Sequence, residues 1–138
     1  MTFALNITTA AEKAATARAA LQADLANIRW QAEAGGVALP NGTNIPTDQQ
    51  TRVSLTGAVN SLDSGMMTEP VAWKFPGGWQ DLTAAEINAA AAAVVAHVQA
   101  CFEAERAVEA QIAGLTDAEV AAFDAQAAFD AALAGQGA

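Results

Sequence analysis

Three side chains that could bind a metal or attack a substrate share one face of a predicted helix. His97, Cys101 and Glu105 stand at positions i, i+4 and i+8, and nitrogen, sulfur and oxygen ligands of this kind hold zinc in proteins. Only His97 and Cys101 are spaced closely enough to share one ion comfortably. The chain has no second cysteine or histidine to complete a set of four ligands. We therefore expect a polar-edged helix face and no metal site.

Other catalytic chemistry is also poorly matched by the sequence. His97 and Cys101 could form a nucleophile pair, but nothing around them indicates a deep pocket or an oxyanion donor. The carboxylates lie along predicted helices, whereas glycoside hydrolysis needs two of them converging on a cleft. The glycine-rich turns lack the Lys-Ser/Thr that follows a phosphate-binding loop. We expect no catalytic residues, no cofactor and no enzymatic activity.

The elements that carry these side chains are mostly helices. Four capping signatures, in which a threonine is followed three residues later by Glu or Gln, predict helix starts. The predicted helices cover residues 10–34, from the second signature to about 63, 84–113, and 117 to about 133, and glycines follow the first three. The threonines of the four signatures are Thr9, Thr47, Thr83 and Thr116.

Two short β-hairpins are predicted between the helices. Val37 and Leu39 alternate before an Asn41-Gly42 turn signal, with Ile45 on the return strand. The second hairpin pairs residues 71–75 with 79–82 across Pro-Gly-Gly. We predict a helix-dominated single α+β domain with long Ala-rich helices and two small hairpins. Its boundaries are 1–8 for an N-terminal arm or short strand, 9–134 for the domain and 135–138 for a flexible tail.

The second hairpin is unusually aromatic. With a three-residue loop Phe75 would face Trp79, and Trp73 would point to the same side as Phe75. Two strands alone are marginal in water, so we expect this side to lie on a helix, with Trp30 near the end of the first helix available to receive it. Three interpretations stay open: a small core packed on helices, a surface that binds a partner, or a platform for a small molecule or sugar.

The longest predicted helix carries a heptad seam. Apolar residues recur along residues 87–112 at four- and three-residue intervals, interrupted by Glu105, a polar residue of the kind that sets register. The seam could pack on the chain's own first and last helices, or it could meet other copies in a homo-oligomer. Its members are Ile87, Ala91, Val94, Val98, Cys101, Glu105, Val108 and Ile112.

The overall charge argues against two classes of partner. The net charge is −9, with six basic residues in 138, too few and too scattered to neutralise nucleic-acid phosphates or to bind an anionic membrane surface. No run of 18 residues is free of polar breaks, so no membrane span is expected. The N-terminal residues lack the basic and apolar regions of a signal peptide. A single cysteine permits no internal disulfide.

The order of motifs over about residues 25–115 resembles a family of small domains of unknown function found in tail-fibre and fibre-associated proteins of tailed bacteriophages. The resemblance implies a structural or assembly role in the virion, and the family has no established catalytic residues to carry over. In chain order the motifs are Ile28-Arg29, a Gly-bearing hairpin, Ile45-Pro-Thr-Asp48, a helix, Val71-Ala-Trp73-Lys74, a Gly turn with Trp79, Leu82-Thr-Ala, and His97-Val-Gln-Ala-Cys-Phe102 with Glu105.

From this resemblance we expect a tail-associated virion structural protein, either a fibre component or an adaptor, made in the host cytoplasm and located in the tail. Its partners would be other tail proteins. The alternative is a tail-fibre assembly chaperone that the virion does not retain. We expect partner contacts through an N-terminal arm that adds a strand to a neighbour and through hairpin anchors. The expected arm residues are Phe3, Leu5 and Ile7, and the expected anchors are Trp73, Phe75 and Trp79.

Overall fold

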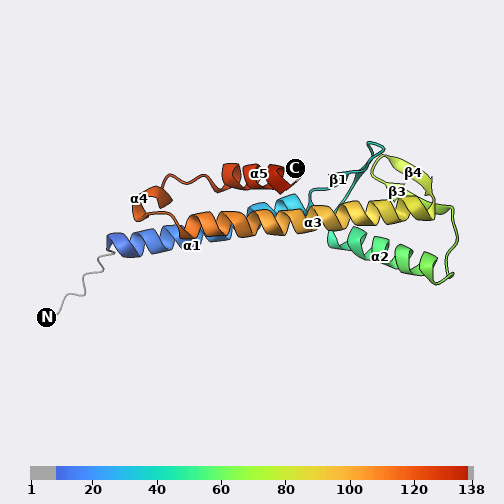
Figure 1. Cartoon of the computed structure of the whole chain (residues 1–138), viewed down its shortest axis with the longest axis horizontal. Coiled ribbons are helices and arrows are strands. Elements are labelled where there is room, and N and C mark those ends of the chain that lie inside the picture. The colour runs from blue at the N-terminus through green and yellow to red at the C-terminus, as the bar shows by residue number, and fades with distance from the viewer. Residues whose placement is uncertain (1–8, 137–138) are drawn as a thin grey trace. The chain divides into compact units, whose positions relative to one another are not determined.

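A computed structural model describes residues 9–136, which form five helices and two antiparallel two-stranded sheets (Figure 1). Helices hold 67% of this part of the chain, which confirms the helix-dominated α+β class. The elements are α1 (Ala10–Ala34), β1 (Val37–Ala38), β2 (Asn44–Ile45), α2 (Gln49–Asp63), β3 (Val71–Phe75), β4 (Gly78–Leu82), α3 (Ala84–Ala113), α4 (Asp117–Val120) and α5 (Ala125–Gln136). The predicted arm residues Phe3, Leu5 and Ile7 lie outside the described residues.

The chain divides into two compact units, which we describe separately. Unit 1 combines Met1–Arg29 with Glu103–Ala138, and unit 2 is Trp30–Phe102. Unit 1 therefore holds most of α1, the second part of α3, α4 and α5. Unit 2 holds both hairpins, α2 and the first part of α3.

Three of the four predicted capping boxes are present. At the start of α3, the Glu86 amide donates to Thr83 Oγ1 at 3.2 Å and the Thr83 amide donates to Glu86 Oε1 at 3.1 Å. The same reciprocal pairs join Thr9 to Glu12 and Thr116 to Glu119. Since each box satisfies amide donors that have no partner inside the helix, the predicted starts of α1, α3 and α4 are confirmed.

The second predicted box was wrong, because Thr47 is used elsewhere. Asp48 is the N-cap of α2 and accepts from the Thr51 amide at 3.0 Å. Thr47 is fully buried: its hydroxyl accepts from the Gly36 amide at 2.9 Å and donates to the Glu33 carbonyl. This threonine therefore ties the carboxyl end of α1 to the segment that follows β2.

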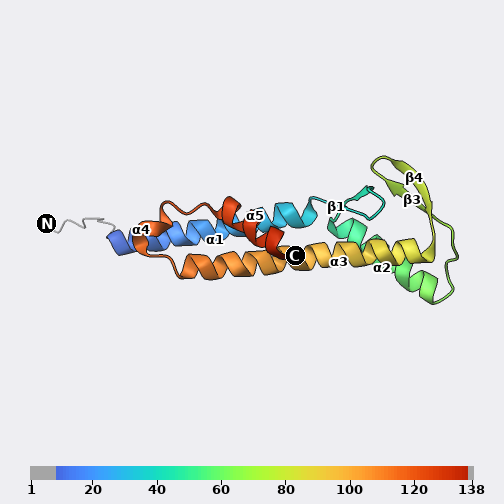
Figure 2. The ribbon, with the colours of Figure 1, turned by 45° about the horizontal axis from the view of Figure 1, so that its top comes forward.

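Unit 2 is built around one apolar cluster. The buried side chains come from both hairpins, α2 and the first part of α3, and α2 runs beside α3 in both ribbon views (Figures 1 and 2). Trp30 was expected beneath the second hairpin, but it is 59% exposed, and the hairpin packs on α2 and α3 instead. The cluster consists of Ile45, Leu55, Ala58, Val71, Phe75, Leu82, Ile87, Ala90 and Val94.

The register of the second hairpin differs from the prediction. Phe75 pairs with Gly78 and Lys74 pairs with Trp79, so the loop is two residues long instead of three. Because neighbours along a strand point to opposite faces, this one-residue slip puts Trp79 on the face opposite Phe75. Gly78 has φ of 134°, a conformation open to glycine, and this allows the tighter turn.

Unit 1 pairs α1 with the second part of α3 in antiparallel fashion. Arg18 donates to the carbonyls of Ile112 and Leu115 at 3.5 and 3.1 Å, whereas Arg29 donates to Glu105 Oε2 at 2.9 Å. Residues later in α1 thus contact residues earlier in α3, so the two helices run antiparallel. Arg18 supplies donors to carbonyls at the end of α3, where a cation is favourable.

The predicted last helix is interrupted. Residues 117–133 were expected to be continuous, but α4 ends at Val120 and α5 begins at Ala125. The Asp124 carboxylate accepts from the Ala127 amide at 3.0 Å, as an N-cap does. Because aspartate favours a cap over a helix interior, α5 starts there. Phe129 of α5 is 1% exposed and anchors this helix.

The heptad seam of α3 is largely covered within the chain. Ile87 and Val94 belong to the unit 2 core, and Val108 and Ile112 are fully buried in unit 1. Unit 2 covers its part of the seam with α2 and the hairpins, whereas one of the two interpretations left open by the sequence had the first and last helices in that place. By length and composition α3 could also cross a membrane; core helices of water-soluble proteins share these properties.

Candidate docking surface at the hairpins

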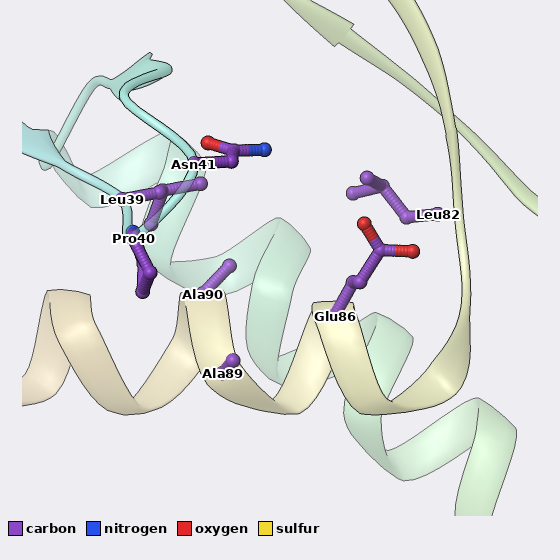
Figure 3. A pocket seen from close by; sticks show the side chains of 7 residues that line it. All are labelled: Leu39, Pro40, Asn41, Leu82, Glu86, Ala89 and Ala90. Carbon is purple, nitrogen blue, oxygen red and sulfur yellow. The ribbon is translucent and has the colours of Figure 1, made fainter.

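A small apolar pocket lies where the first hairpin meets α3 (Figure 3). Leu39 and Pro40 of the β1–β2 loop form one wall, Leu82 at the end of β4 forms another, and Ala89 and Ala90 of α3 form the base. The cavity measures about 130 Å³. Apolar cavities of roughly 150 Å³ take up a benzene ring, so this pocket is the right size for one apolar side chain.

Two polar groups stand at the rim of this pocket. The Asn41 amide and the Glu86 carboxylate both extend into the space between the loop and Leu82 (Figure 3). Each is oriented by the backbone: Asn41 Oδ1 accepts from the Thr43 amide at 2.9 Å, and Glu86 Oε1 accepts from the Thr83 amide at 3.1 Å. One amide donor and one carboxylate acceptor beside an apolar hole suit a peptide whose side chain enters while its backbone stays at the rim.

The second hairpin presents an exposed indole. Trp79 is 70% exposed, and Lys74 Nζ lies 5.7 Å from the centroid of its ring. A cation over an aromatic face is worth about 0.5–1 kcal/mol at an exposed site, and this contact restrains the ring. Gln80 Nε2 donates to Thr43 Oγ1 at 3.4 Å and joins the two hairpins. Trp79 and Leu82 point to opposite faces of this hairpin, so Trp79 with Lys74 and the pocket are two separate sites. We use the name hairpin surface for both sites together.

The three predicted hairpin anchors lie in different environments. Phe75 is 2% exposed and belongs to the unit 2 core. Trp73 is partly buried and packs against the same core. Trp79 alone of the three is largely exposed. Phe75 and Trp73 therefore pack in unit 2, and Trp79 is the one of these three residues whose side chain is largely exposed.

The candidate reactive residues of α3 have local structural partners. His97 Nε2 lies 2.7 Å from the Ala32 carbonyl oxygen and 3.8 Å from Cys101 Sγ, and Cys101 is fully buried. Glu105 pairs with Arg29. Within residues 9–136 no group of three His, Cys, Asp or Glu side chains is placed to hold a metal ion.

Two carboxyl groups with lowered pKa values serve as helix caps. Hydrogen bonds from the side chain and then the backbone of Thr51 lower the pKa of Asp48. Backbone and side-chain hydrogen bonds with Thr116 lower the pKa of Glu119. Neither residue lines the pocket at the hairpins, so these shifts report helix capping, not a tuned acid or base.

The pocket at the hairpins was not predicted from the sequence. Asn41 was interpreted only as a turn residue and Glu86 only as a cap. The available signal was the pair Ala89-Ala90, one turn after the Glu86 cap, since small side chains on a helix leave room beneath a neighbouring loop. That signal becomes specific only once the β1–β2 loop is known to lie above it.

Comparison with known proteins places the chain in a family but adds no chemistry. No curated protein and no solved structure matches it significantly. The model of one family, described as a domain of unknown function (DUF4376), matches residues 16–132. This range takes in nearly all of the described helices and both hairpins, and the chain belongs to that family of domains of unknown function.

Proposed function

We propose that this protein is a tail-associated structural component of a bacteriophage virion, a fibre component or adaptor that acts by binding other tail proteins and not by catalysing a reaction. The binding role is supported by the exposure of Trp79. This large side chain lies mostly in solvent, although the apolar side chains on the other face of its hairpin are buried. The association with tails draws its support from the motif resemblance.

The energetics of interfaces favour Trp79 as a contact residue. Tryptophan is enriched among residues that dominate binding energy, because it buries a large area with few rotatable bonds. Exposure of this indole to water does not stabilise the hairpin when no partner is bound. Lys74 limits its motion, so less conformational freedom is lost when a partner covers it.

The pocket is a second contact site on the hairpins, separate from Trp79, and it adds specificity. One apolar side chain of a tail protein would enter between Pro40 and Leu82, and its backbone would meet Asn41 and Glu86. Such a preformed hole selects partners by side-chain size and by the direction of their backbone amides.

Mass spectrometry of purified particles tests the virion assignment. The proposal predicts that this chain is present in a fixed ratio to the other tail proteins after density-gradient purification. A chain abundant in infected cells but missing from mature particles would overturn the structural role and leave the assembly chaperone. A matched core protein of the virion controls for recovery.

A further inference from the structure

A second surface, distinct from the hairpins, lies between α2 and α3 of unit 2. A groove of about 300 Å³ runs between the two helices, with Leu55, Val94 and Val98 among its apolar lining. Val95 is 67% exposed on α3, and Val53 on the neighbouring helix is 64% exposed. Its full lining is Arg52, Leu55, Thr56, Ala91, Val94, Val95, Val98, Gln99 and Phe102.

The apolar side chains of α3 in this groove repeat with helical spacing. Ala91, Val95, Val98 and Phe102 follow one another at intervals of four, three and four residues. Ala91 and Val98 belong to the heptad seam, and Val95 and Phe102 extend it towards solvent. Such a stripe fits a neighbouring helix that packs along α3. An apolar stripe along a groove between two helices is the kind of surface that an amphipathic helix occupies.

The lining of the groove lacks the acidic residues that dominate the chain. The protein carries a net charge of −9, yet none of the nine lining residues is acidic and one, Arg52, is basic. Arg52 also borders a shallower depression along α2. An incoming carboxylate would therefore find a local cation here and no acidic lining residue.

Arg52 can bind a further carboxylate. One of its terminal nitrogens pairs with Glu33 Oε1 at 3.2 Å, while its side chain remains 36% exposed. Its Nε is buried without a hydrogen-bond partner among the described residues. A guanidinium has five N–H donors, so pairing with Glu33 leaves donors for a second acceptor.

We propose that the α2–α3 groove binds an amphipathic helix of a partner protein, which lays apolar side chains along Ala91, Val95 and Val98 and places one carboxylate on Arg52. This mode matches known recognition of amphipathic helices by apolar grooves. The inference concerns only the chemistry of the groove and does not depend on the virion assignment or on the hairpin surface.

A peptide titration tests the proposal on the purified chain. The probe is a synthetic amphipathic helix about four turns long, with leucines at i, i+4 and i+7 and one glutamate flanking them. Its matched control has glutamine instead. We expect saturable binding, with amide shifts in nitrogen-15 NMR spectra centred on the groove, and affinity about tenfold weaker for the glutamine peptide.

Protein variants locate the binding site. Val95→Glu puts a like charge on the groove and should weaken binding of the glutamate peptide at least about tenfold. Ala96→Glu adds the same charge at an exposed neighbour that does not line the groove and should change affinity less than about twofold. Arg52→Gln should remove the difference in affinity between the two peptides. This substitution also removes the ion pair with buried Glu33. If the Arg52→Gln variant unfolds, the comparison of Val95→Glu with Ala96→Glu is decisive.

Three results would overturn the proposal: no saturable binding of either peptide, equal affinity for both, or equal weakening by Val95→Glu and Ala96→Glu. Failure here would leave the particle experiment unaffected, because that experiment reports on the virion assignment alone.

Discussion

Replacing Thr47 by valine tests how unit 2 is held together. Thr47 Oγ1 accepts from the Gly36 amide and donates to the Glu33 carbonyl, and the residue is fully buried. Valine has nearly the same shape but offers neither group a partner. The substitution therefore removes two hydrogen bonds with little change in packed volume.

The expected cost follows from the two orphaned backbone groups. A buried donor or acceptor left unsatisfied costs about 1–3 kcal/mol, so Thr47→Val, which orphans one of each, should lower the free energy of unfolding by about 2–6 kcal/mol. Thr47→Ser keeps the hydroxyl and loses one methyl group, which costs about 1 kcal/mol. The control variant should thus be clearly more stable than the valine variant.

Urea unfolding followed by far-UV circular dichroism measures both variants. Hydrogen exchange adds a local readout, because the Gly36 amide should lose protection in Thr47→Val and keep it in Thr47→Ser. If valine costs no more than serine, or if Gly36 stays protected, Thr47 is not the link between α1 and the segment after β2.

Three further predictions concern caps, an ion pair and the thiol. The folded-state pKa of Asp48 is below its ordinary value of 3.8, so the stability that Asp48 contributes is complete above that pH and is lost as pH falls through the folded pKa. The difference in urea midpoint between wild type and Asp48→Ala should therefore be constant above about pH 5 and should disappear at lower pH. A difference that stays constant down to the acid limit would contradict the capping role. Glu105→Ala should lower the free energy of unfolding by about 2 kcal/mol, because the partly buried Arg29 loses this carboxylate. Replacing both Arg29 and Glu105 by leucine should recover most of that loss in the same unfolding assay. A double variant no more stable than the single one would refute the pairing. Cys101 is fully buried, so its reaction with a disulfide reagent should follow unfolding, and rapid labelling of the native protein would contradict the packing of α3.

Helix existence and most helix ends could be predicted from the sequence, because the signals are local. The Thr83–Glu86 box and Gly114 bracket α3 at the observed residues. Gly36 follows α1 with φ of 95°, a conformation that favours glycine after a helix end. Each of these features depends on a few neighbouring residues, so one sequence suffices.

The wrong predictions depended on tertiary context. Thr47 and Asp48 are both competent caps by residue type, and burial of Thr47 against Gly36 decides between them. The Pro-Gly-Gly loop permits two registers, and only the shorter loop puts Leu82 on the same buried face as Phe75. Trp30 was expected to receive the second hairpin because it lies near the end of the first helix, yet α2 and α3 already cover that hairpin.

The candidate surfaces were even less accessible to sequence reasoning. The pocket needs the β1–β2 loop to lie above Ala89 and Ala90, contacts that join residues about fifty positions apart. The α2–α3 groove likewise depends on which side of α3 the seam buries. Trp79 was found because its residue type alone marks it as a candidate anchor.

Incorporation of Trp79→Ala into particles tests the central claim, that this protein works through its hairpin surface. Copies per particle are counted by quantitative mass spectrometry for wild type, Trp79→Ala and Trp30→Ala, which removes an exposed indole outside the hairpins. Both variants should keep the wild-type fold. The account predicts that particles lose at least about nine tenths of the Trp79→Ala chain, a loss of the size expected for a hot-spot residue, and retain Trp30→Ala. Equal retention of wild type and Trp79→Ala would contradict it.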